Sequence, residues 1–209
     1  MSAADALARI FEADRQARAA EEDLLGEPSG EVGPLLAAAV EEALALDDED
    51  ESELRLHRLA DLCAQVPGPK MADALIRILD HGEPSVRAEA GEALLDVAFE
   101  RFKEVARAVE RALDRDHRGV AMQELPFVLT EVRDPDPIPL VARFLAHPDA
   151  AVVAAAIEAM AAYGDPGAAQ FLEPLLDDER EATLEDVDEG PTAIGELAAA
   201  ALEELGVEL

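Results

Sequence analysis

The stretch LDHGEPSVRAEAGEALLDVA, Leu79–Ala98, carries the pattern that decides the fold. Val86, Ala90, Ala93 and Leu94 follow one another at offsets of 0, 4, 7 and 8, which places them on one face of a helix. The Gly-Glu-Pro segment in front of them is a turn signal that ends the preceding Leu-rich segment. The stretch therefore predicts the end of one helix, a tight turn and a second helix.

Segments with the same pattern recur along the chain. The leucines that end the first helix of each unit, Leu79, Leu113, Leu145 and Leu176, lie 34, 32 and 31 residues apart. The residues expected at the apolar offsets are Val120, Phe127 and Val128 in the third unit, Val152, Ala156, Ala159 and Met160 in the fourth, and Ile194, Ala198, Ala201 and Leu202 in the last. Alanine at the second offset allows close stacking of neighbouring units, although Glu124 breaks this pattern in the third unit. Because one helix pair cannot bury both of its faces, the pairs are predicted to stack into a solenoid.

The composition favours an all-α protein. Half of the 209 residues are hydrophobic, aromatic residues make up only 3%, and the apolar content is mostly Ala and Leu, which are strong helix formers. We predict an α-α superhelix of about five helix pairs with an N-terminal capping helix. The expected division is an N-terminal helix at 1–25, a linker at 26–34, and a repeat domain at 35–209 with an acidic insertion at about 178–190 looped out.

Two segments resemble a known repeat family. LDHGEPSVRAEAGEAL (79–94) and LAHPDAAVVAAAIEAMAAYGDPGAAQFLEPLL (145–176) are similar to HEAT-like repeats of the bilin-lyase type. The matching residues are Pro84, Val86, Arg87, Ala90, Ala93 and Leu94 in the second unit, and Val152, Ala156, Ala159, Gly164, Asp165 and Pro166 in the fourth. The resemblance is clearest over residues 69–205 and implies an α-solenoid that usually binds other proteins.

The charge restricts the kinds of partner. The chain has 17 basic and 48 acidic residues, a formal net charge of −31, so phosphate backbones and anionic membranes should repel it. We therefore expect no nucleic-acid and no membrane partner, and a basic protein as the target if the charge has one. General solvation of the surface is the alternative explanation of the same acidity.

The compartment follows from the cysteine count and the N-terminus. The single cysteine, Cys63, excludes an internal disulfide, and its apolar neighbours predict a buried thiol. The N-terminus lacks the apolar run of a signal peptide, and no segment approaches the ~20 apolar residues of a membrane span. These features predict a cytoplasmic protein.

Carboxylates on the second helices are the candidate binding residues. Helical phase places Glu89, Glu92, Asp96, Glu131 and Glu158 on a shared concave face, where they would receive a basic protein segment. The first hypothesis is a non-enzymatic interaction scaffold or adaptor. The alternatives are an acidic immunity or inhibitor protein that mimics nucleic acid and neutralises a basic toxin or nuclease, and a bilin-lyase-like enzyme, which rests on the resemblance alone.

Other chemistry-bearing residues have structural interpretations. His81, His117 and His147 recur in the turns, but neighbouring turns lie ~10 Å apart and a zinc ligand must reach within about 2.1 Å, so no metal, cofactor or catalytic residue is predicted. Arg87 is predicted to pair with an acid of the neighbouring unit. Pro126 predicts a kinked or broken helix over 122–132, because proline lacks an N–H and clashes with a preceding carbonyl.

Overall fold

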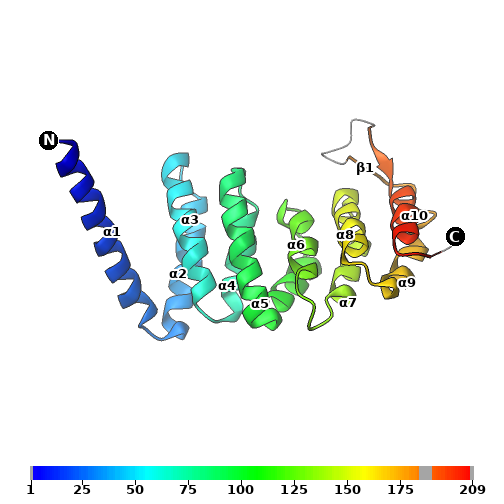
Figure 1. The fold of residues 1–209 in the computed structure, drawn as a ribbon, viewed down its shortest axis with the longest axis horizontal. Helices are drawn as coiled ribbons and strands as arrows, with labels where there is room; N and C mark the ends of the chain where they lie inside the picture. The colour runs from blue at the N-terminus through cyan, green and yellow to red at the C-terminus, as the bar shows by residue number, and fades with distance from the viewer. Residues whose placement is uncertain (1, 184–189, 208–209) are drawn as a thin grey trace.

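The computed structural model describes residues 2–183 and 190–207 and arranges the helices in one row, with the two chain ends at opposite ends of the row (Figure 1). After α1 (Ala3–Leu25), the described helices form five pairs, which confirms the predicted all-α solenoid. The first helices are α2 (Ser29–Leu44), α4 (Pro69–Leu79), the second half of α5 (Pro84–Asp114), α7 (Ile138–Val141) with the 3-10 helix η1 (Ala142–Ala146), and α9 (Ala169–Leu172) flanked by the 3-10 helices η2 (Pro166–Ala168) and η3 (Glu173–Leu175). Their second helices are α3 (Glu49–Gln65), the first half of α5, α6 (Ala121–Thr130), α8 (Ala150–Tyr163) and α10 (Ile194–Glu204).

The long helix α5 joins two units without a loop. Its dihedral angles leave the helical region at Arg101 (φ −140°, ψ 46°), where the second helix of one unit becomes the first helix of the next. The Arg101 guanidinium donates to the carbonyl of Ala64 at the end of α3 and to the Glu100 carboxylate. In the fourth unit the same junction is a loop, because Gly164 takes a left-handed conformation (φ 76°) that ends α8.

The stacking positions read from the sequence form the core of three units. Val86, Ala90 and Leu94 are fully buried, and Ala156 in α8 is buried at the position equivalent to Ala90. In the last unit the expected set of Ile194, Ala198, Ala201 and Leu202 is likewise buried. Small side chains at these positions let the second helices of adjacent units approach closely.

The third unit has a different register from the one predicted. Val120 is 40% exposed, while Ala121, Leu125 and Leu129 are fully buried in its place and at the following stacking positions. The turn before α6 (115–120) is also longer than the turns before α5 (80–83) and α8 (147–149). It packs tightly against the second unit, because a Cβ at Gly119 would collide with the carboxylate of Asp80.

The predicted break at Pro126 is wrong. Helix α6 runs from Ala121 to Thr130 with Pro126 inside it. The proline ring is buried in the core, and this burial offsets the one backbone hydrogen bond that the ring removes. The Thr130 hydroxyl donates to the carbonyls of Pro126 and Phe127 and so satisfies part of the last turn.

The N-terminal segment differs from the expectation in two ways. Helix α1 begins with a capping box formed by Ser2 and Asp5, but none of its residues is buried, and it meets the array only near its C-terminal end (Figure 1). It does not cover the first pair as a capping helix would. The expected linker at 26–34 is also shorter, because α2 already begins at Ser29 and buries Val32 and Gly33.

The acidic insertion leaves the array as a short hairpin. Glu181–Ala182 (β1) pairs antiparallel with Thr192–Ala193 (β2), which brings the two ends of the insertion together before α10 begins. The middle of the insertion predicted at about 178–190, residues 184–189, lies outside the described residues.

Enlarging a stacking alanine should separate neighbouring units. Ala156→Leu is expected to lower the free energy of unfolding by about 1–3 kcal/mol, because the buried site has no room for three more carbons. Ala162→Leu, on the exposed side of the same helix, is the matched control and should change it by less than about 0.5 kcal/mol. Urea unfolding followed by circular dichroism measures both, and equal effects would contradict the close-stacking interpretation.

Candidate functional site

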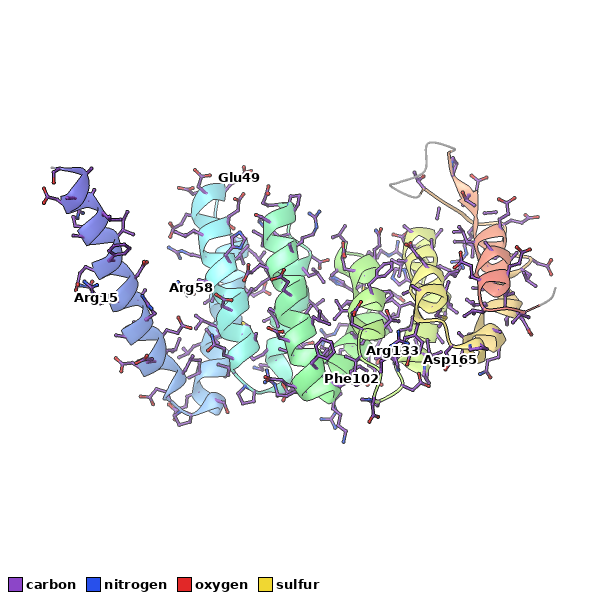
Figure 2. The ribbon with its side chains drawn as sticks, viewed as in Figure 1. Arg15, Glu49, Arg58, Phe102, Arg133 and Asp165 are labelled. Atoms are coloured by element: carbon purple, nitrogen blue, oxygen red, sulfur yellow. The ribbon has the colours of Figure 1, made fainter. Side chains whose placement is uncertain are left out.

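The five predicted carboxylates lie along the second helices, as the helical phase indicated. Glu92, Asp96, Glu131 and Glu158 are exposed, and Glu89 is half-buried. Side chains from these helices project along the whole row (Figure 2). The carboxylates do not gather at one point: Glu89, Glu92, Glu131 and Glu158 line three separate hollows, and Asp96 lines none of them.

One hollow lies between the first half of α5 and α6. It has a volume of about 490 Å³, and its lining includes the carboxylates of Glu92, Glu124 and Glu131. Phe127 and Val128, displaced from the core by the register of the third unit, form part of its apolar wall. The hollow thus combines three carboxylates with apolar surface, and Arg87 is the one basic residue among the described residues of its lining.

A second hollow lies between α8 and α10. Its volume is about 380 Å³, and two carboxylates, Glu158 and Glu204, face it from the two helices. The rest of its lining is small or aliphatic: Ala154, Ile157, Ala161, Ala162, Leu197, Ala200 and Ala201. This is an alanine floor with a carboxylate on each side.

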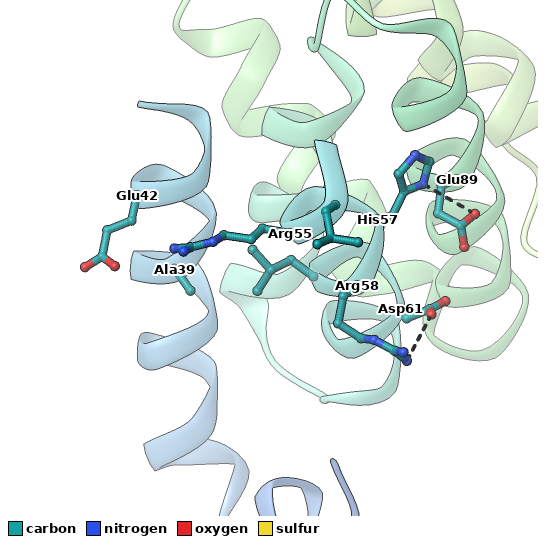
Figure 3. A pocket seen from close by; sticks show the side chains of 9 residues that line it. Ala39, Glu42, Arg55, His57, Arg58, Asp61 and Glu89 are labelled. Atoms are coloured by element: carbon teal, nitrogen blue, oxygen red, sulfur yellow. Dashed lines mark ion pairs between the residues drawn. The ribbon is translucent and has the colours of Figure 1, made fainter. Parts of the chain in front are cut away.

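A third hollow, of about 620 Å³, is lined mainly by residues of α3. Glu89 of α5 lies at one edge of it (Figure 3). His57 Nδ1 lies 3.9 Å from Glu89 Oε2, and Asp61 lies on the same side of α3. Burial, followed by repulsion from and hydrogen bonding with Asp61, raises the pKa of Glu89 above its ordinary value of 4.5, and Glu92 adds to the repulsion. Glu89 is therefore a carboxylate held near other negative charges.

Sequence reasoning missed Glu124 and Glu204. The signal for Glu124 was its failure to fit the stacking pattern, since a charged residue at a core offset indicates a shifted register. The more general signal is the charge of the second helices themselves. Helices α6, α8 and α10 contain no Lys, Arg or His, so every charged side chain on them is a carboxylate.

Three arginines of the first helices, Arg77, Arg111 and Arg143, form pairs that join neighbouring units. Arg77 makes two hydrogen bonds of 3.1 and 3.2 Å to the carboxylate of Glu41, and this contact lowers the pKa of Glu41. The same arrangement recurs between Arg111 and Asp73 in the next unit, and Arg143 Nη2 lies 2.6 Å from Asp114 Oδ1 in the one after. Ion pairs this exposed contribute at most about 1 kcal/mol each to the stability of the fold. They do, however, place these three guanidinium groups against carboxylates of the first helices.

Arg87 does not have the role predicted for it. Its Nη1 donates to the carbonyls of His81 and Gly82 at 3.1 and 2.8 Å, so it closes the turn of its own unit instead of pairing with an acid of the next. The turn carbonyls lie within reach of a side chain one turn further along α5, which explains the local contact. Arg77, Arg111 and Arg143 make the contacts between units instead.

Two of the turn histidines, His117 and His147, belong to a hydrogen-bonded ladder. His117 Nε2 pairs with the carboxylate of Asp80, whose other oxygen accepts the Ala121 N–H at the start of α6. His147 Nε2 donates to the His117 carbonyl at 3.0 Å, and its Nδ1 accepts from the N–H of Asp149. The ladder links the second, third and fourth units.

Arg180 extends this ladder to the last unit. Its Nη1 donates to the His147 carbonyl at 2.8 Å, and its guanidinium also binds Asp178, which lowers the pKa of that carboxylate. Among residues 2–183 and 190–207 no group of three or more His, Cys, Asp or Glu is placed to hold a metal ion. Cys63 is fully buried, and burial raises the pKa of its thiol to about 12.

Removing the His147 side chain should break the ladder. His147→Ala leaves the N–H of Asp149 and the carbonyl of His117 without these partners in a nearly closed site, so a loss of about 1–3 kcal/mol of stability is expected. His81→Ala is the matched control, because His81 occupies the equivalent turn but bonds only its own unit. If urea unfolding gives the same loss for both variants, the ladder does not join the units energetically.

Neutralising Glu89 should stabilise the fold at neutral pH. A carboxyl whose pKa is raised by folding disfavours the folded state above that pKa, and this penalty disappears below the unfolded value of about 4.5. Glu89→Gln should therefore raise the melting temperature at pH 7 and lose this advantage near pH 4. Glu110→Gln, on the first-helix side of α5, is the control, and an equal gain for both at pH 7 would contradict the prediction.

Comparisons with known proteins agree with this architecture. Residues 102–187 match the family model for HEAT repeats, and a search of curated proteins finds no match. The crystal structure of an engineered protein is similar over 90% of this chain and 89% of that chain, at 17% identity and a TM-score of 0.34, which adds nothing to the fold argument. Within the described part of the chain no helix has the length and apolar character needed to cross a membrane. HEAT repeat families are typically non-enzymatic scaffolds for protein interaction. Residues 102–187 are thus similar to HEAT repeats, and the stacked helix pairs agree with that similarity.

Proposed function

We propose that this protein is a non-enzymatic scaffold that binds a basic protein segment along its second helices. One observation carries the proposal: α6, α8 and α10 have no basic side chain, and the hollows beside them combine carboxylates with apolar surface. The carboxylates proposed to bind the basic segment are Glu92 and Glu131 in one hollow and Glu158 in another. Glu89 and Asp96 extend the same surface along α5.

The hollows suit the two parts of an arginine or lysine side chain. The alkyl stem would lie on the alanine floor between α8 and α10, and the cationic head would reach Glu158 and Glu204 at its sides. Charge-assisted hydrogen bonds to carboxylates are about twice as strong as neutral ones. A flat carboxylate surface would attract the cation but offer nothing to the stem, so the hollows favour a partner with both features.

The net charge assists the encounter. A formal charge of −31 attracts a basic segment over distances of about a Debye length, which raises the association rate and makes it sensitive to salt. Three first-helix arginines, Arg77, Arg111 and Arg143, are already paired with acids, whereas α6, α8 and α10 carry carboxylates and no basic side chain. The proposed partner is therefore a basic protein segment and not a nucleic acid or a membrane.

Charge reversal on the second helices tests the proposal. The probe is a fluorescent synthetic peptide rich in Arg and Leu, measured by anisotropy against the wild-type chain at low and physiological salt. The pair Glu92→Lys with Glu158→Lys should weaken binding about tenfold or more, equivalent to about 1.4 kcal/mol. A peptide with Arg replaced by Gln should not bind.

The control keeps the overall charge change identical. Glu110→Lys with Glu173→Lys adds the same four charges to exposed positions of first helices. If this pair weakens binding as much as the second-helix pair, only net charge matters and the second-helix surface is not a site. A tight one-to-one complex that inhibits a basic nuclease, in place of peptide binding, would support the inhibitor alternative instead.

A further inference from the structure

The N-terminal end of the solenoid leaves apolar surface uncovered on two elements. On the end pair, Leu35 of α2 and Leu54 of α3 are 63% and 68% exposed. On α1, Leu7, Ile10 and Phe11 are 51%, 56% and 53% exposed. These are five of the most exposed large apolar side chains among the described residues, and they cluster at one end of the array, beside the hollow around α3 that Ala39, Leu54 and Leu59 help to line.

The C-terminal part of α1 is already fastened to α3. Glu21 Oε2 lies 3.3 Å from Arg58 Nη1, and Glu21 Oε1 accepts from Gln65 Nε2 at 3.1 Å. Leu24 and Leu25 pack against the core below this contact. The two helices run in the same direction and diverge toward the N-terminus of α1 (Figures 1 and 2).

Three of these exposed apolar residues, Leu7, Ile10 and Leu54, lie on the sides of α1 and α3 that already meet. At 100° per residue, Leu7 and Ile10 fall within about 40° of Glu21 around the axis of α1. On α3, Leu54 falls within about 40° of Arg58 and Gln65, the residues that bind Glu21. The apolar side of α1 therefore faces the end of the solenoid, and only the divergence of the two helices separates the surfaces.

We infer that α1 is a closing arm: it pivots at its last turn and the connection 26–28, and its residues Leu7, Ile10 and Phe11 then cover Leu54 and the hollow beside it. The structure shows the open form of this arm. Closure would give the solenoid a terminal cap with a polar outer face, which repeat arrays require at their ends. This inference concerns the end of the array and stands independently of the proposed second-helix site.

The arm of the same chain is favoured over a second copy as the occupant. Two copies that each carry a formal charge of −31 repel one another, whereas α1 is held beside the end pair by only three residues between α1 and α2. A short tether makes the contact intramolecular and raises the effective concentration of the arm to the millimolar range. The Glu21 contact also fixes the direction in which the arm closes.

Disulfide trapping in the full-length chain tests closure. Ile10→Cys combined with Leu54→Cys is expected to form an intramolecular disulfide in dilute protein under mild oxidation, read on a non-reducing gel and by mass spectrometry. Ala8→Cys combined with Leu54→Cys is the matched control, because Ala8 lies about 140° around the helix from Glu21. The native Cys63 is buried and does not compete.

Thermal stability provides a second readout that needs no cross-link. If the arm were always open, the aspartate of Ile10→Asp would remain in water and the melting temperature would change little. Closure predicts that Ile10→Asp lowers the melting temperature by about 2–4 °C relative to Ala8→Asp. An intermolecular disulfide, no disulfide, equal trapping of the control pair, or equal melting temperatures for the two aspartate variants would each overturn the closing arm.

Discussion

Close approach of successive second helices is the constraint on which the rest of this structure depends. Ala90 and Ala156 are fully buried where neighbouring units touch, and no larger side chain fits at that separation without moving a unit. A single helix pair buries only part of its apolar surface, so each unit is stable only beside the next. Where Leu125 occupies the equivalent position in α6, the longer turn before the helix shifts the register by one residue.

Two polar systems reinforce this stack at its edges. The Asp80–His117–His147–Arg180 ladder joins the turns, and the pairs of Arg77, Arg111 and Arg143 join the first helices. In both systems the imidazole or guanidinium groups bind a residue of a neighbouring unit. The second helices α6, α8 and α10 themselves carry carboxylates and no basic side chain.

This segregation of charge connects the architecture to the proposed function. A chain in which acids and arginines alternated on both layers would have the same composition but no side suited to a cationic segment. Here the same arginines that hold the first helices together leave Glu92, Glu124 and Glu131 facing a hollow with apolar walls. The second helices therefore carry the stacking residues on their buried face and the proposed binding carboxylates on their exposed face.

The sequence by itself determined the helix pairs, the stacking residues and the positions of the candidate carboxylates, because helical periodicity is a local property of the chain. It did not determine partners between units. The local role of Arg87, the register of the third unit, the continuity of α6 through Pro126 and the position of α1 all depend on how the chain packs in three dimensions. Only the tertiary structure decided these, since a contact between units depends on turn length and burial, which periodicity within one helix does not record.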